Sequence, residues 1–183
     1  LVPVGIFAVL GAIRSQAADI PPIHDIATDT ANPPVFSQTV LDQRAAAGAN
    51  PLNDYATPLG ELEMWSESEP PLADRSHAQV IAAAYPDLAP LPLGSTSPAE
   101  AAELVVSAME EMGFAQVTAD AETGRIEGVA ETFWFGFKDD MVVRIADGAI
   151  DFRSVSRVGV SDLGANAARI AALRDAVAER LNR

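Results

Sequence analysis

The distribution of proline predicts that regular secondary structure lies mainly in the second half of this 183-residue chain. Each proline fixes φ and removes a backbone donor, so long helices and central strands are excluded where prolines recur. Eight of the 13 prolines fall between positions 19 and 75, namely Pro21, Pro22, Pro33, Pro34, Pro51, Pro58, Pro70 and Pro71. We therefore expect residues 19–75 to form a long, irregular, proline-rich segment that packs on the rest of the protein. Within it, only residues 35–47 favour a helix of useful length, which Gly48 would end.

Residues 76–183 carry the patterns of a folded α+β domain. Ser97-Pro98-Ala99-Glu100 has the spacing of a capping box, with proline at the first helical position, and apolar residues then recur on one helical face. Strand-like runs follow at 114–119, 125–137, 141–146 and 149–157, and Asp147-Gly148 between the last two is typical of a two-residue hairpin turn. A second helix is predicted over 167–181. This order predicts an antiparallel four-stranded meander with helices packed on one face.

The charge of the chain excludes one class of partner. Twelve Lys and Arg against 26 Asp and Glu give a net charge of −14, and a surface this acidic repels phosphate backbones. We therefore expect no nucleic-acid partner. Cysteine is absent from the sequence, which excludes disulfides, thiolate nucleophiles and Cys-ligated zinc. The last forty residues hold seven arginines against five acids, so they either fold against the acidic remainder or present a local anion site.

The first thirteen residues, LVPVGIFAVLGAI, carry no charge and are followed by Arg14. As a helix they would extend roughly 20 Å, which is shorter than the ~30 Å hydrocarbon core of a bilayer. We predict that residues 1–18 form the end of a membrane span or a hydrophobic anchor. The alternatives are the apolar region of a signal peptide, with Ser15-Gln16-Ala17 as a small-residue cleavage site, and a buried helix or strand.

Few residues suggest catalysis. His24-Asp25 has the composition of a base with an orienting carboxylate, but no Gly-x-Ser-x-Gly motif accompanies it. Asp139-Asp140 has the chemistry of a metal site or an acid–base pair, although between two strands it is more typical of a turn. The sequence contains no P-loop, dinucleotide fingerprint or zinc pattern, so we expect no cofactor and no metal.

The densest polar pattern lies in residues 150–170. Strand alternation places Arg153 and Arg157 on the face opposite Ile150 and Phe152, and the following loop leads into a helix whose first N–H groups favour an anion. A candidate anion site follows, made of Arg153, Ser156, Arg157, Ser161, Asn166 and Arg169. The alternative is that the two arginines pair with Asp151 and Asp162 and stabilise the corner between strand, loop and helix.

The same segment resembles a known family. Asp151-Phe152-Arg153-Ser154-Val155-Ser156-Arg157-Val158-Gly159, followed by Ser161-Asp162-Leu163-Gly164, is similar to the closing signature of the domain of unknown function 1499 family. The likeness extends upstream through Phe135-Gly136-Phe137-Lys138-Asp139-Asp140 to Pro22-Ile23-His24-Asp25-Ile26, and departs from the family at Val160, where many relatives carry a polar or basic residue. The resemblance implies a bacterial envelope protein, often with membrane helices before the domain, and supplies no established activity.

Two functional hypotheses follow. The first is a non-catalytic, membrane-tethered domain that faces the periplasm and serves an inner-membrane complex as an accessory or interaction subunit, with a membrane protein as its partner. The second is a small-anion-binding protein or hydrolase that uses the Arg153/Arg157 corner, with Asp140 or Glu127 as a base.

Overall fold

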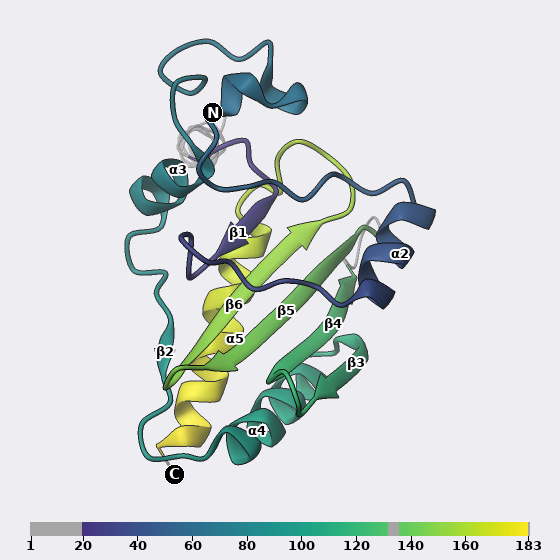
Figure 1. Cartoon of the computed structure of the whole chain (residues 1–183), viewed down its shortest axis with the longest axis vertical. Coiled ribbons are helices and arrows are strands. Elements are labelled where there is room, and N and C mark those ends of the chain that lie inside the picture. The colour runs from purple at the N-terminus through teal and green to yellow at the C-terminus, as the bar shows by residue number, and fades with distance from the viewer. Residues whose placement is uncertain (1–19, 132–135, 183) are drawn as a thin grey trace, which may run out of the picture.

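The computed structural model describes residues 20–131 and 136–182. At its centre lies a six-stranded antiparallel sheet with the strand order β1-β6-β5-β4-β3, in which β2 also pairs with β6 (Figure 1). The elements in chain order are β1 (Asp25–Ala27), α2 (Gln38–Ala46), the 3₁₀ turns η1 (Leu59–Glu61) and η2 (Glu63–Trp65), α3 (His77–Ala84), β2 (Leu91–Pro92), α4 (Pro98–Glu111), β3 (Ala115–Asp120), β4 (Arg125–Glu131), β5 (Lys138–Ala146), β6 (Ala149–Ser156) and α5 (Ala165–Leu181). The α+β class is confirmed.

The predicted meander corresponds to β3–β6, but the sheet is larger than the four strands expected. β1 and β2 add two short antiparallel pairings to β6, and both come from outside the meander. With three and two residues, they are too short to show the alternation that reveals a strand in sequence. The β5–β6 turn has the predicted geometry, because Asp147 and Gly148 both have positive φ, at 51° and 77°, as a type I′ turn requires.

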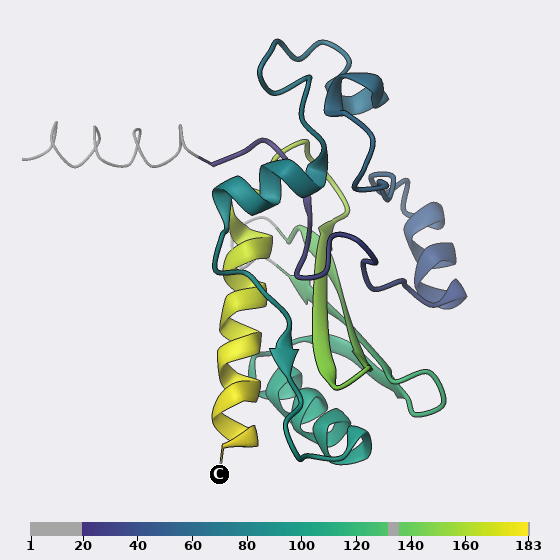
Figure 2. The same ribbon diagram turned by 60° about the vertical axis from the view of Figure 1, so that its left-hand side comes forward.

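Helices α4 and α5 cover one face of the sheet (Figure 2). The capping box predicted for α4 is present, since Ser97 Oγ accepts the N–H of Glu100 and the Glu100 carboxylate accepts the N–H of Ser97. Met109 of α4 packs closely on β4 at Gly128, where an added Cβ would come within 2.7 Å of the Met109 side chain. The main apolar core therefore lies between these helices and the sheet.

The prediction of helices on one face concerned the two that flank the meander, and α4 and α5 do share a face; α2 lies on the other one. Figure 2 shows α2 on the side of the sheet opposite α5, where a small apolar cluster of Phe36, Val142 and Val155 joins the helix region to the strands. Polar contacts also hold the helix region in place: the N–H of Ser37 donates to Glu127, and Arg44 donates to Asp140. Apolar periodicity does not reveal a helix held in this way.

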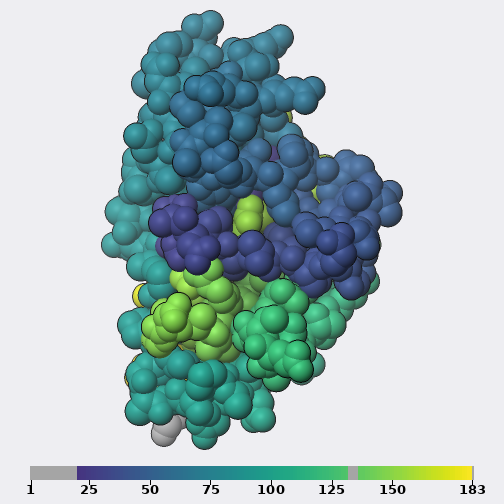
Figure 3. Space-filling model, in the orientation of Figure 1, coloured from purple at the N-terminus to yellow at the C-terminus, as the bar shows by residue number. Residues whose placement is uncertain are grey.

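The segment predicted as irregular contains more order than expected. It supplies β1, α2 and both 3₁₀ turns, although α2 is shorter than the 35–47 predicted. In Figure 3 its atoms form a band across the face of the sheet opposite α4 and α5, and they leave the region below the band uncovered, where β4, β5 and their turns lie. The helix α3, which follows the segment, was not predicted; Ser76 and Gln79 form its capping box.

The hydrophobic stretch predicted to end a membrane span, residues 1–18, lies outside the described residues. Across residues 20–131 and 136–182, the structure contains no helix with the length and apolar character needed to cross a membrane.

Candidate functional site

Charged side chains gather on the face of the sheet that α2 covers. Strand register brings them into line: Glu127 lies opposite Val142, which lies opposite Arg153, and Asp140 lies opposite Val155 in the neighbouring row. Since alternate residues of a strand share a face, one face collects the charges of three strands. These charged residues are Arg125, Glu127, Glu131, Lys138, Asp140, Arg144, Asp151 and Arg153, followed by Arg157 just after β6. Charges buried on a sheet must be paired, so their partners decide what remains available for a ligand.

Arg153 is paired with Asp25 at the centre of this face. Its Nε and Nη2 donate to the two carboxylate oxygens at 2.9 and 2.7 Å, and its Nη1 donates to the carbonyl of Pro34 at 3.1 Å. The Tyr55 hydroxyl also donates to Asp25. Burial alone would raise the pKa of Asp25, but Arg153 outweighs it and holds that pKa below its ordinary value. Arg153 is only 4% exposed, so it contacts no ligand from solvent while this pair is intact.

Two arginines share Asp140. Arg44 of α2 donates to Oδ2 at 2.5 Å and to the carbonyl of Asn50 at 2.8 Å. Arg157 donates to both oxygens through Nε and Nη2, at 2.6 to 3.2 Å, and the hydrogen bonds to Asp140 raise the pKa of its guanidinium. Two positive charges therefore face one carboxylate.

The partners predicted for Arg153 and Arg157 were Asp151 and Asp162, and that pairing is wrong. Asp151 lies directly opposite Arg144 in the β5–β6 register and accepts a hydrogen bond from it at 2.8 Å. Asp162 accepts the N–H groups of Gly164 and Asn166, at 2.8 and 2.9 Å, and so caps α5. The helix start that was predicted to attract an anion already binds the protein's own carboxylate.

The turn predicted at Asp139-Asp140 is wrong. Both residues belong to β5, and their side chains face opposite sides of the sheet. Asp140 lies on the α2 side, whereas Asp139 accepts a hydrogen bond from Arg169 of α5 at 2.6 Å. The two carboxylates therefore neither share a metal ion nor act as an acid–base pair.

The six residues of the candidate anion site do not converge. Arg153 and Arg157 lie on the α2 side of the sheet, as predicted. The others lie on the α5 side or in the loop: Asn166 donates to Ser156 Oγ at 2.9 Å and accepts from Arg169 at 2.6 Å, while Ser161 Oγ accepts the N–H of Leu163 at 3.2 Å. Of the six, Arg157 is the one that lines a cavity described below.

The two histidines lie in a buried cluster of rings. His24 stacks on Trp65 with ring centroids 5.4 Å apart, and His77 stacks on Tyr55 at 5.6 Å and meets Trp65 edge-on at 4.9 Å. In the part of the chain that the structure describes, neither ring nitrogen of His77 has a hydrogen-bond partner. Burial lowers the pKa of His24 and lowers that of His77 to about 4. Both rings are therefore neutral packing groups near pH 7.

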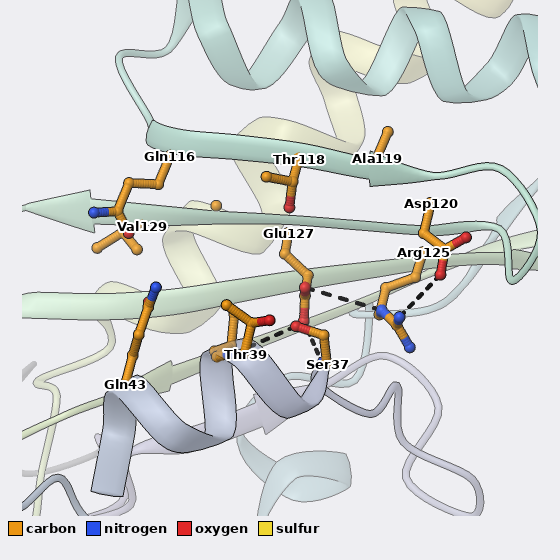
Figure 4. Close-up of a pocket in the computed structure, with 12 residues that line it drawn as sticks. Ser37, Thr39, Gln43, Gln116, Thr118, Ala119, Asp120, Arg125, Glu127 and Val129 are labelled. Atoms are coloured by element: carbon orange, nitrogen blue, oxygen red, sulfur yellow. Dashed lines mark hydrogen bonds and ion pairs between the residues drawn. The ribbon is translucent and has the colours of Figure 1, made fainter. Parts of the chain in front are cut away.

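A groove runs between α2 and the β3–β4 pair, where the polar face is not covered (Figure 4). One cavity of about 440 Å³ is lined by hydroxyls and amides from both sides, including Thr39 and Gln43 of α2 and Thr118 of β3. At its base, Glu127 accepts the N–H of Ser37 at 2.6 Å and lies 3.9 Å from the Nε of Arg125. The side chains of this end are thus held in place before any ligand binds.

A second cavity of about 490 Å³ continues the groove toward β5. The two cavities share Gln43, Gln116 and Val129, and the second is also lined by Lys138 and Arg157. A β-bulge between Ala115 and Thr118 sets Gln116 at φ 55°, a conformation that non-glycine residues seldom adopt.

A third hollow, of about 740 Å³, lies on the other side of β3, between α4 and the β3–β4 hairpin. Apolar side chains such as Val106 and Ile126 line much of it. Its polar groups are fewer than those of the groove, which therefore offers more hydrogen-bonding groups for specific recognition.

A family model described as protein of unknown function (DUF1499) matches residues 25–177. The match covers most of the chain, from the first residue of β1 into α5. The chain belongs to this family. The resemblance predicted from the sequence is confirmed, and the DUF1499 region includes the whole sheet and both walls of the groove. No curated protein matches the chain.

In this DUF1499 domain, the arginines and acids of the closing signature contact other parts of the same chain. Arg153 reaches β1, Arg157 reaches β5, and Asp162 caps α5. The sequence did not reveal the groove, because Gln43 and Gln116 belong to no motif. The one available signal was Lys138, which is the only lysine in the sequence.

Proposed function

We propose that this chain is a non-catalytic, membrane-tethered domain of the bacterial envelope that binds a partner protein through the groove between α2 and β3–β4. It would serve as an accessory or interaction subunit of an inner-membrane complex, with the domain in the periplasm. The observation that carries the proposal is the groove itself, an uncovered part of the charged face that is lined by hydroxyl and amide groups.

The chemistry of the lining favours binding over reaction. Thr39, Thr118, Gln43 and Gln116 offer donors and acceptors suited to a peptide backbone. The histidines lie elsewhere, in the ring cluster around Trp65. Both walls belong to regular elements, and a site on such elements holds its geometry more closely than one on loops.

The hydrolase alternative receives less support. It requires Arg153 to act on a ligand, yet Arg153 is bound on three sides by Asp25 and Pro34. Its proposed bases are also engaged: Asp140 faces two arginines, and Glu127 accepts the N–H of Ser37. Only Arg157 of the predicted corner lines the groove.

The sequence of the first thirteen residues supports the proposed membrane tether. The first thirteen residues are uncharged and mostly apolar, as the end of a membrane span would be. We expect the full-length protein to stay with membranes after a carbonate wash. Its release into the wash would overturn the tether.

The binding function is tested by purification in mild detergent. We expect a stoichiometric membrane protein to copurify with the wild type, to be lost from Thr118→Trp, and to be retained by Ala172→Trp. Both residues are exposed, so neither variant should unfold; Thr118 lies in the groove, whereas Ala172 lies on α5, which packs on the other face. If the Thr118→Trp variant still copurifies with the membrane protein, the groove is not the binding site. If no stoichiometric partner copurifies with the wild type, the interaction function is wrong.

A further inference from the structure

We infer that the end of the groove at Lys138 and Arg157 binds an oxyanion, a carboxylate or phosphate group of the ligand that fills the groove. The inference rests on the proposed function and names the chemistry that the site would recognise. It depends on four side chains that line one cavity: Gln43, Gln116, Lys138 and Arg157.

The cavity at Lys138 and Arg157 has a local excess of positive charge. Arg44 and Arg157 share Asp140, and of this group Arg44 and Asp140 are the more deeply buried, with side chains 5% and 1% exposed. They form a neutral buried pair, so the Arg157 side chain, at 14% exposure, brings charge to the cavity that Asp140 only partly offsets. Its Nε and Nη2 donate to Asp140, while Nη1 donates to no group within the described residues.

Lys138 adds a second cation at the same place. It is exposed, lines the cavity with Arg157, and forms no ion pair with any residue that the structure describes. Glu131 lies opposite Lys138 in the β4–β5 register and also lines the cavity, which leaves two cations and one carboxylate. In a chain with a net charge of −14, this balance is unusual, and a single anion would neutralise it.

The remaining walls add neutral hydrogen-bond donors to the two cations. Gln43 and Gln116 approach from α2 and β3, and each amide has two N–H donors to offer (Figure 4). The C-terminal end of α2, which would ordinarily repel an anion, also borders the cavity. The carbonyls of residues 43–45, however, accept the N–H groups of residues 47–49, so these three are already paired. Oxyanions bind best where charged and neutral donors converge in this way.

The single lysine provides a direct test. An N-hydroxysuccinimide ester acetylates amines, and peptide mapping by mass spectrometry separates Lys138 from the N-terminal amine. The probes are inorganic phosphate, acetyl-tetraalanine with a free C-terminal carboxylate, and the same peptide as a C-terminal amide, each compared with sodium chloride at equal ionic strength. At ten times its dissociation constant, a bound probe should slow acetylation of Lys138 about ten-fold by mass action.

Variants separate site binding from general screening. We expect protection to disappear in Arg157→Gln and to weaken in Gln43→Ala, an exposed position whose change should not disturb folding. Arg174→Gln on α5 removes the same charge outside the groove and should leave protection unchanged. Protection by phosphate would indicate a phosphate or phosphate-ester ligand, and protection by the carboxylate peptide but not its amide would indicate a partner's carboxylate. Protection by no probe beyond sodium chloride, or equal protection in Arg157→Gln, would overturn the inference. Neither result bears on whether a partner protein copurifies.

Discussion

The face of the sheet that packs on α4 and α5 is mainly apolar, whereas the face that packs on α2 and the preceding segment carries most of the charges. On the first face, residues such as Ile126 and Phe152 are stabilised by removal of apolar surface from water, which is not directional. On the second face, Arg153 and Arg157 are stabilised only if particular carboxylates reach them. The comparison teaches that the helical layer makes the domain stable, while the charged layer specifies where the N-terminal segment lies.

The largest loss of stability is expected when an ion pair on the charged face is broken. Arg153→Met would leave the Asp25 carboxylate buried without its cation, and we expect a loss of about 3–5 kcal/mol in the free energy of unfolding measured in urea. Phe152→Ala, on the apolar face, should cost a similar amount through the cavity it creates.

Replacing the partner residue as well distinguishes the charged face from the apolar face. Asp25→Leu combined with Arg153→Met removes both charges, so the double variant should be more stable than Arg153→Met alone. No removal of a second residue beside Phe152 should give such a recovery. Additive losses at Asp25 and Arg153 would contradict the proposed difference between the faces.

The next effect concerns pH. His77 has a folded-state pKa of about 4, below the usual value of 6.5, because it is buried; the unfolded chain therefore binds its proton first as the pH falls. We expect stability to fall between pH 6.5 and 4, by about 3 kcal/mol in total from this residue. In the His77→Phe variant, the urea midpoint of unfolding should depend less on pH in that window. An unchanged slope in this variant would contradict the role of His77.

A smaller effect is expected for Arg157→Ala. Since Arg44 still faces Asp140 in this variant, the carboxylate keeps one cation, and the loss should be about 1.5–3 kcal/mol for its hydrogen bonds. Arg180→Ala removes an exposed pair with Glu111 and should cost under about 1 kcal/mol. Equal shifts in melting temperature for the two variants would show that Arg157 acts as a surface residue.

The smallest effect marks the part of the charged face that the N-terminal segment leaves uncovered. Lys138→Gln should change the free energy of unfolding by less than about 0.5 kcal/mol, because the side chain is exposed. A loss comparable to that of Arg157→Ala would mean that Lys138 serves the fold rather than a ligand. Circular dichroism during thermal unfolding distinguishes the two results.

Local signals explain which parts of the fold were predictable. The α4 capping box and the Asp147-Gly148 turn each depend on neighbouring residues, and both are confirmed. Charge pairing depends on distant ones: Arg153 and Asp25 are 128 residues apart, and Arg44 and Asp140 are 96 apart. Sequence proximity suggested Asp151 for Arg153, but a residue directly across the sheet lies nearer than one two positions along a strand, and Asp151 faces Arg144.

The groove was missed for a related physical reason. It forms where α2, β3 and β4 approach one another, and its amides from Gln43 and Gln116 carry no periodic or motif signal. The face on which Arg153 and Arg157 lie was predictable from alternation alone. The sequence did not predict which of the two arginines lines a cavity, because that depends on how far the N-terminal segment extends across the sheet.

The pairing of β1 with β6 has a consequence for the order of folding. β1 lies near the start of the chain, yet its sheet partner is the last strand to be synthesised. The local hairpin between β5 and β6 closes a short loop, whereas β1 must close one of more than a hundred residues, which is slow. We therefore expect the helical layer and the meander to form before β1 pairs with β6, while the charged face still contacts water. Pulse-labelled hydrogen exchange should find the β1 amides protected after those of β5.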